Sequence, residues 1–318
     1  ATSPRERSGT DRRTGARVYQ MPPAGLLFGL AAAAGWGLTD VTAAVAGRRI
    51  SPLVLAVTAQ SIGLGLFVLV LLVSGRSLTA TAAGDAALFG MIASLGYVAS
   101  FAALRIGPLA VVSPVIAAWG GLTVVLAVVF RGETLTVGDW IGVLLATIGV
   151  ALVGLVLDGG SRPRLVSRGV GFALLANLGF AIPTVGLAAP IQEVGWLPVT
   201  VISRVANLST VVMLIVIAMT IARVRGGAGG RPGGLRGQAR GSLLAGIAAV
   251  GAFDAVATIS FSVGLEVAET WLVGLASSFG PALAVVFAVG VLGERLRPMQ
   301  WLGLAALVAA VVVLALPG

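Results

Sequence analysis

The stretch "RGETLTVGDWIG", residues 131–142, has a near copy in "LGERLRPMQWLG", residues 292–303. Aligning Glu133 with Glu294 also aligns a glycine before each glutamate, and a leucine, a tryptophan and a second glycine after it. The offset, 294 minus 133, is 161 positions, about half of the 318-residue chain. A polar phrase that returns at half the chain length predicts a duplicated unit.

The composition indicates a membrane protein. Hydrophobic residues make up 58% of the chain and charged residues only 10%, which is more apolar surface than one water-soluble core can hide. The chain has no Cys and no His, so disulfides, thiolate or histidine metal sites and Ser/His/Asp catalysis are excluded. We therefore expect no catalytic residues, no metal site and no cofactor.

Apolar runs of about 20 residues, the length that spans a bilayer as a helix, occur ten times. They cover about 24–46, 53–74, 86–105, 109–130, 138–157, 169–189, 198–221, 243–264, 268–291 and 299–317. The breaks at "RIGP" and "LEVAE" are the shortest. The predicted fold is an all-α polytopic membrane protein with ten transmembrane helices.

Five spans precede a linker at 158–168 and five follow it, which predicts two five-helix repeats at 23–157 and 169–318. Because five is odd, the second repeat enters the membrane inverted relative to the first, as in many secondary transporters. The repeated phrase then lies on opposite faces of the membrane. Residues 1–22, which are rich in Arg, are expected to be a disordered basic tail rather than a cleaved signal peptide.

The chain resembles the EamA-type family of the drug/metabolite transporter superfamily in three features. These are ten spans in two halves, "GWGLTD" at 35–40, and a Pro-containing span followed by the GE phrase and a W-x-G span. The resemblance implies a polytopic exporter or importer of small metabolites, often amino acids, with a central cavity between the halves. It assigns the first-span aromatic to Trp36 and its counterpart to Phe180. The Pro-then-Arg pattern matches Pro198 and Arg204, whereas the first half has Gln60 and no Arg.

Three charged residues lie within the predicted spans: Asp40, Arg204 and Asp254. A charge in hydrocarbon costs at least about 2.5–3.5 kcal/mol, so such residues are functional candidates. Asp40 and Arg204 differ in depth by about 17 Å and cannot pair, whereas Asp254 lies between them. We expect an Arg204–Asp254 ion pair and assign proton coupling to Asp40, whose pKa desolvation would raise. Alternatively, the pair only locks two helices and Asp40 reaches interfacial water.

Uncharged polar and aromatic residues in the spans are further candidates for substrate contact, the alternative for each being interhelical packing or hydrogen bonding. The candidate substrate-binding set is Trp36, Asp40, Gln60, Tyr97, Asn177, Arg204, Asp254 and Thr258, with Asn207 and Ser262 as additional cavity residues. Thr258 and Ser262 follow Asp254 at i+4 and i+8, so the three share one helix face. Glu133 and Glu294 are expected to cap the helix that follows each of them, the alternative being a gating role.

The net charge of +9 lies mainly in residues 1–22 and 222–241. No aromatic residue interleaves with these Arg residues, which argues against nucleic acid and for membrane lipids as the partner.

Loop Arg counts place both termini outside, whereas the tail and the family resemblance place them in the cytoplasm, which we adopt. Because every basic residue is Arg, we expect a GC-rich bacterial source and a multi-pass inner-membrane location for a monomer or homodimer.

Two classes of function fit such a chain. The first is a secondary transporter of a small polar, zwitterionic, amino-acid-like or drug-like metabolite, working by alternating access with possible proton coupling. The second is a flippase for lipids or lipid-linked sugars, for which the basic residues 222–241 would line a headgroup rim. A scaffold or receptor would need a large polar domain, and a membrane enzyme would need clustered catalytic groups, neither of which the sequence contains.

Overall fold

The computed structural model describes residues 22–47, 52–78, 80–106, 115–154, 168–224, 240–280, 282 and 297–316, and across these residues it is helical, without strands. Its helices are α1 (Pro22–Gly47), α2 (Pro52–Ser74), α3 (Ala83–Ile106), α5 (Trp119–Arg131), α6 (Val137–Gly154), α7 (Arg168–Val194), α8 (Trp196–Val224), α9 (Arg240–Val267), α10 (Thr270–Ser277) and α12 (Pro298–Ala315). Most of the predicted tail and linker, together with Glu294, fall outside the described residues.

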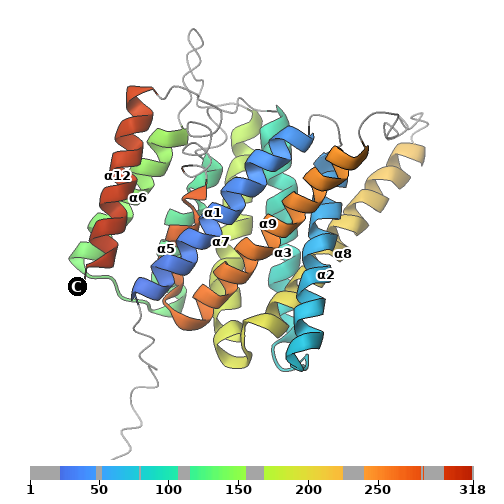
Figure 1. The fold of residues 1–318 in the computed structure, drawn as a ribbon, viewed down its shortest axis with the longest axis horizontal. Coiled ribbons are helices and arrows are strands. Elements are labelled where there is room, and N and C mark those ends of the chain that lie inside the picture. The colour runs from blue at the N-terminus through green and yellow to red at the C-terminus, as the bar shows by residue number, and fades with distance from the viewer. Residues whose placement is uncertain are drawn as a thin grey trace, which may run out of the picture.

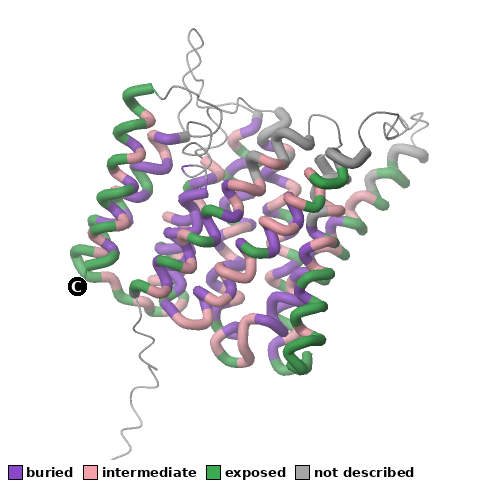
Figure 2. The backbone as a smooth tube through the Cα atoms, viewed as in Figure 1, coloured by how far each residue is buried: buried purple, intermediate pink, exposed green. Residues whose placement is uncertain are grey.

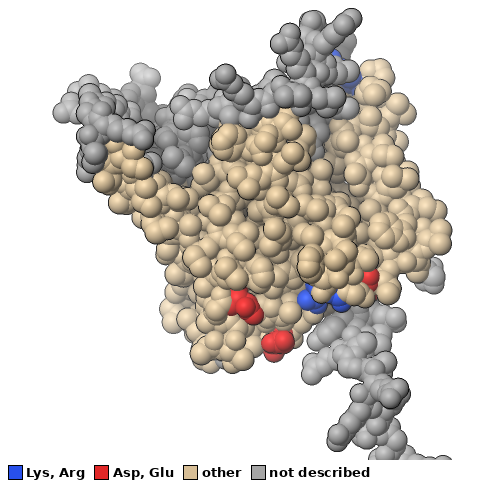
Figure 3. Space-filling model, turned by 180° about the vertical axis from the view of Figure 1, so that it is seen from behind, with Lys and Arg blue, Asp and Glu red and all other residues tan. Residues whose placement is uncertain are grey.

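The helices have the length and composition of membrane spans. Five of them, α3, α7, α8, α9 and α12, contain windows long and apolar enough to cross a bilayer, and shorter apolar helices lie within 23–39, 60–74, 115–131 and 137–153. Buried residues concentrate on the helices in the middle of the molecule, whereas the outer helices α2, α8 and α12 expose many side chains (Figure 2). Uncharged residues cover most of the face in Figure 3, and its acidic side chains lie near one end. The predicted all-helical, polytopic membrane architecture is confirmed at this level.

The break at "LEVAE" is confirmed, since α9 ends at Val267 and α10 begins at Thr270. The expected break at "PIQEVGWLP" is much shorter than predicted. Helix α7 continues through Pro190 to Val194, and a single residue, Gly195 with φ +92°, separates it from α8. The polar residues of that segment therefore lie in the C-terminal turns of α7. No longer loop is needed, because one glycine in the left-handed region is enough to turn the chain.

Close backbone approach holds the middle of the bundle together. Helix α1 packs along α9 and α3 packs along α7, with α5 against α10 and α6 against α12 (Figure 1). At the α3–α7 crossing, a Cβ added to Gly179 would lie 2.4 Å from the Cα of Gly96. At the α1–α9 crossing, a Cβ on Gly35 would lie 2.7 Å from that of Ala257. Small residues thus let these helices touch, as is usual where lipid gives no hydrophobic drive for association.

The repeated phrase caps a helix, but not the helix we expected. Glu133 follows the C-cap Gly132, and its two carboxylate oxygens accept the backbone N–H groups of Thr270 (3.1 Å) and Trp271 (2.9 Å). These are the first residues of α10, which lies 137 positions away in the other half of the chain. The prediction that Glu133 caps the following helix, α6, is therefore wrong.

The start of α6 has its own partner. Asp139, in its first turn, accepts the backbone N–H of Thr136 at 2.7 Å and its hydroxyl at 2.8 Å. Because the N-terminus of α6 has these local hydrogen-bond partners, the Glu133 carboxylate can accept the N–H groups at the positive N-terminal end of α10. The equivalent role of Glu294 stays a prediction, because that residue is not described.

Candidate functional site

A buried ion pair lies between α8 and α9. The Nη2 atom of Arg204 is 2.9 Å from Oδ2 of Asp254, and the two side chains are 5% and 10% exposed. Both residues lie within predicted spans, and the expected Arg204–Asp254 pair is confirmed as a contact. Charges as deeply buried as these persist only when they are paired or hydrogen-bonded.

Helix α2 completes the surroundings of the guanidinium. Arg204 donates through Nη1 to Oε1 of Gln60 and through Nη2 to the hydroxyl of Thr258 at 2.6 Å. Its Cζ atom lies 5.4 Å from the ring centre of Phe67, within cation–π range. Two of the sequence candidates, Gln60 and Thr258, are therefore ligands of one guanidinium.

Asp254 retains unused acceptor capacity. Its Oδ2 atom touches the Arg204 guanidinium, but no N–H or O–H group among the described residues is directed at it. The same Nη2 group donates to the hydroxyl of Thr258. A carboxylate that accepts two or three hydrogen bonds when satisfied is thus left with a site for an additional donor.

Two further polar pairs continue from this cluster to one end of the helices. Thr200 donates its hydroxyl to that of Ser262 at 2.9 Å, and the backbone N–H of Trp196 donates to Glu266 at 2.8 Å. We call these pairs, together with the Arg204 cluster, the polar seam: Trp196, Thr200 and Arg204 of α8, and Asp254, Thr258, Ser262 and Glu266 of α9. Successive members are four positions apart on each helix, so they lie one turn apart along one face.

Aromatic side chains from five helices meet one another beside α9. Trp36 of α1 lies 5.3 Å from Phe261, centre to centre, and Tyr97 of α3 lies 5.2 Å from Phe180 of α7. Trp119 of α5 lies 6.4 Å from the rings of Trp36, Phe180 and Phe261. We call these five residues the aromatic cluster. All five are only partly buried, although their helices lie in the middle of the bundle (Figure 1).

Trp36 contributes a polar atom as well as a ring. Its Nε1–H is buried and has no acceptor in the described part of the chain. A buried donor left unpaired costs about 1–3 kcal/mol, so such an atom is a candidate contact for a ligand.

The remaining candidates have other surroundings. Asn177 donates its amide to the carbonyl oxygen of Val115 at 2.9 Å, which joins α7 to the segment before α5. Asn207 is buried, with its Oδ1 unpaired among the described residues. Asp40 lies in α1, but its side chain is not described. The roles of these residues in substrate binding stay predictions.

Sequence reasoning missed Phe67, Trp119, Phe261 and Glu266 as neighbours of the candidate site. Glu266 continues the four-residue spacing of Asp254, Thr258 and Ser262, so that pattern, followed one turn further, would have found it. The aromatic residues have no comparable spacing, because each comes from a different helix.

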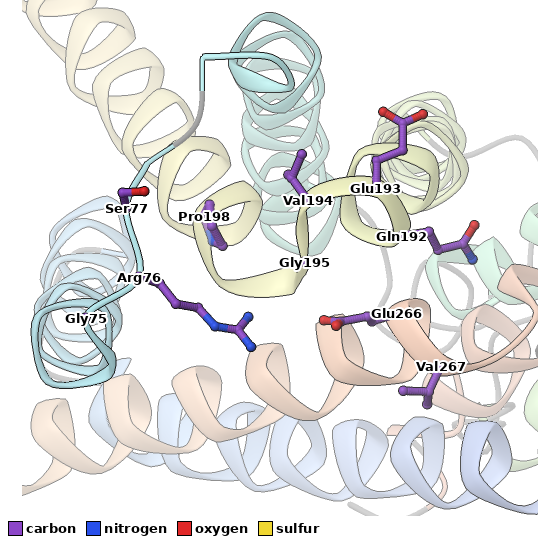
Figure 4. A pocket seen from close by; sticks show the side chains of 10 residues that line it. All are labelled: Gly75, Arg76, Ser77, Gln192, Glu193, Val194, Gly195, Pro198, Glu266 and Val267. Atoms are coloured by element: carbon purple, nitrogen blue, oxygen red, sulfur yellow. The ribbon is translucent and has the colours of Figure 1, made fainter.

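An open pocket of about 660 Å³ lies at the end of the bundle where α2 and α9 end and α7 turns into α8 (Figure 4). Its lining residues are Gly75, Arg76, Ser77, Gln192, Glu193, Val194, Gly195, Pro198, Glu266 and Val267. We call it the end pocket. Glu266 belongs both to this pocket and to the polar seam. In the described part of the chain, no three acidic residues cluster in a way that could hold a metal ion.

An apolar helical bundle with a charged pair in its interior is the architecture of a polytopic membrane protein. Residues 23–155 match the EamA-like transporter family. This match lies in the first half of the chain, and the resemblance to the EamA-type family of the drug/metabolite transporter superfamily that was drawn from the sequence is confirmed there.

Comparison with whole proteins adds the fold. No curated protein matches the chain. A solved structure described only as "Crystal structure of protein" matches with a TM-score of 0.71 and 19% identity, over 92% of this chain and 96% of that chain. This similarity extends through both halves and concerns the fold alone.

Proposed function

We propose that the chain is a secondary transporter that moves a small zwitterionic metabolite across the membrane by alternating access between two inverted five-helix repeats. The family match supports a transporter, and members of that family are not enzymes. The proposed repeats are those expected from the sequence, 23–157 and 169–318, with ten spans in total.

The packing of the helices supports the repeat. Suppose that α1, α2, α3, α5 and α6 of the first half correspond to α7, α8, α9, α10 and α12 of the second. Exchanging the halves then turns the α1–α9 contact into α7–α3, α2–α9 into α8–α3, and α1–α10 into α7–α5, all of which are present. The α2–α8, α5–α10 and α6–α12 contacts map onto themselves. Such exchange symmetry is expected for two related units around a shared axis.

The observation that carries the proposed function is the buried Arg204–Asp254 pair, with an unused acceptor on Asp254. Paired charges of opposite sign offer partners for the carboxylate and the ammonium group of one zwitterion. The aromatic cluster supports a substrate that also carries a ring or an apolar side chain. Trp36, Gln60, Tyr97, Asn177 and Thr258 complete the proposed substrate-contacting set.

Asp40 is the proposed proton-coupling residue, since a carboxyl group within an apolar span is readily protonated. An Asp40→Asn variant should then still exchange substrate but fail to accumulate it against a gradient. We further propose a bacterial inner-membrane location with cytoplasmic termini, membrane lipids as neighbours, no nucleic-acid partner, and a monomer or homodimer.

Transport by the full-length protein in proteoliposomes tests the proposal. We expect saturable uptake or efflux of at least one radiolabelled amino acid, and loss of this activity in Arg204→Gln at equal protein content. Movement of a fluorescent lipid analogue without amino-acid transport would instead establish the flippase alternative. If neither the lipid nor any amino acid moves, the proposed function is wrong.

A further inference from the structure

We propose that the end pocket is a second binding site for an amino-acid-type zwitterion, at the mouth of the polar seam. The inference rests on the proposed function, because it takes the same class of substrate. It adds a site outside the interior cluster, with Arg76 as the partner of the carboxylate and Glu266 as the partner of the ammonium group.

The first observation is the arrangement of charges across the pocket. Arg76 follows α2 and Glu266 lies in the last turn of α9, and their side chains point toward one another from opposite walls (Figure 4). The ion pairs formed by the described residues are Arg131–Glu133 and Arg204–Asp254, so Arg76 and Glu266 are not joined directly. A ligand with a carboxylate and an ammonium group can bridge such a gap.

The local backbone fixes the Glu266 carboxylate and leaves space for the Arg76 guanidinium. Glu266 accepts the N–H of Trp196 through Oε2, which fixes its carboxylate at the start of α8 and leaves Oε1 for a ligand. The Arg76 guanidinium extends over Gly195, where an added Cβ would lie 3.1 Å from Nη1. Because Gly195 also has a φ of +92°, the sequence keeps this wall both tightly turned and free of a side chain.

The balance of charge favours a zwitterion over an anion. Among the described lining residues, Arg76 is the cationic side chain and Glu266 is the acidic one that faces it, whereas the Glu193 carboxylate points away from both (Figure 4). An isolated phosphate or carboxylate would meet one partner and one like charge, but a ligand with both signs meets a partner for each. The planar guanidinium suits bidentate carboxylate binding, and a volume of about 660 Å³ is that of a small-molecule site.

The polar seam connects this pocket with the interior. From Glu266 it passes the Thr200–Ser262 pair and reaches Thr258, Asp254 and Arg204. The two sites therefore lie at the two ends of one row of polar groups between α8 and α9. A zwitterion held in the end pocket is at the start of the polar contacts that lead inward.

A thiol introduced at the pocket provides a specific readout. The chain contains no cysteine, so Ser77→Cys places a single thiol in the pocket lining. This variant of the full-length protein is labelled with an environment-sensitive fluorophore in phosphatidylcholine nanodiscs. It is titrated with the twenty amino acids, and with phenethylamine and 3-phenylpropionate, which lack the carboxylate and the ammonium group of phenylalanine respectively. We expect a saturable response to at least one amino acid, and at least about tenfold weaker binding of both phenylalanine analogues than of phenylalanine.

Charge variants then test the two assigned partners. Arg76→Gln should weaken amino-acid binding about tenfold or more and leave phenethylamine binding unchanged. Glu266→Gln should weaken amino-acid binding as well. Its amide oxygen can still accept the Trp196 N–H, so the hydrogen bond at the N-terminus of α8 is retained. Asp85→Asn removes a negative charge from the first turn of α3 and is the matched control, with no change in binding expected.

The outcomes separate this site from the proposed function. Arg204→Gln should stop transport but leave the fluorophore titration intact. If Arg204→Gln misfolds, the milder interior-site variant Thr258→Val replaces it in both measurements. A titration that survives Arg76→Gln, or no response to any amino acid, overturns the end-pocket proposal and leaves the interior site standing. A response to phosphatidylglycerol in the nanodisc in place of amino acids assigns Arg76 to lipid headgroups and also overturns it. An intact titration without any transport refutes the proposed function alone.

Discussion

Arg204 and Asp254 stabilise each other within the bilayer, and each is costly alone. Replacing one partner leaves the other charge buried and unpaired, which we expect to cost about 3–5 kcal/mol in the free energy of unfolding. Arg204→Gln and Asp254→Asn should both lower stability by this order, and the double variant should lose clearly less than the sum. Denaturation of the purified proteins in detergent measures all four corners of this cycle. Strictly additive losses would show that the pair does not interact energetically.

Trp36 should have opposite effects on binding and on stability. Trp36→Phe keeps a ring in the aromatic cluster but removes the buried Nε1–H, which has no acceptor among the described residues. We expect substrate binding to weaken about three- to tenfold if that N–H serves the substrate, with stability retained because an unpaired donor disappears. Trp140→Phe, at an exposed position on α6, is the control. Equal affinities for the two variants and the parent protein would exclude Trp36 Nε1 as a ligand contact.

Residue-level reasoning from the sequence succeeded where one helix carries the information. A charged residue within an apolar span predicts a buried partner, and the four-residue spacing from Asp254 to Ser262 indicates that these residues share one face of the helix. It failed for Glu133 because the local sequence does not determine which helix N-terminus lies next to that residue in the folded protein. The first residues of α10 come within reach only when the two halves pack together. Trp119 and Phe261 of the aromatic cluster were missed for the same reason, since the cluster forms only when five helices pack together.

At the scale of helices, the α3–α7 crossing should tolerate no side chain at its contact point. A Cβ on Gly179 would lie 2.4 Å from the backbone of Gly96, so Gly179→Ala must push the helices apart. We expect a loss of about 1–3 kcal/mol or more. Gly171→Ala, on the same helix with open space around it, should be neutral or slightly stabilising. Thermal denaturation of both variants checks this difference, and equal stabilities would refute the close contact.

The turn between α9 and α10 should make stability depend on pH. Burial raises the pKa of Glu269 above its ordinary value of 4.5, opposed by a hydrogen bond from Trp271 and reinforced by Glu133 and Asp139. The folded chain therefore binds the proton more tightly than the unfolded chain. This contribution to stability is complete below about pH 4.5 and is lost as the pH rises through the higher, folded pKa.

Glu269→Gln tests this dependence because its amide oxygen can still accept the indole N–H of Trp271, which now donates to the carboxylate at 2.7 Å. We expect the variant to be more stable than the parent protein at pH 7 and equally stable near pH 4, as followed by denaturation across the range. A difference that stays constant with pH would mean that Glu269 is not the titrating group.

At the scale of the molecule, the two halves interlock instead of standing side by side. Helix α1 packs mainly with α9 and α10 of the other half, and α3 packs mainly with α7 and α8. The repeat proposed from the sequence is therefore not a separately packed unit, because each half packs mainly against the other. Separate expression of 23–157 would expose the faces that α9 and α7 now cover. Whole-molecule contacts of this kind have no counterpart in local sequence pattern.

The inverted arrangement predicts where labels will react. Residue 134, beside the first GE phrase, and residue 295, beside the second, should lie on opposite faces of the membrane, because an odd number of spans separates them. In a chain without native cysteine, Thr134→Cys and Arg295→Cys should each react with an impermeant maleimide from one side only, and from different sides. Ser77→Cys should follow Thr134→Cys, since α2 and α5 both end at the face from which α3 and α6 begin (Figure 1). Labelling in intact cells and in inverted vesicles also identifies which face is cytoplasmic. Reaction of residues 134 and 295 from the same side would mean that the halves run parallel, and the alternating-access proposal would then lose its structural basis.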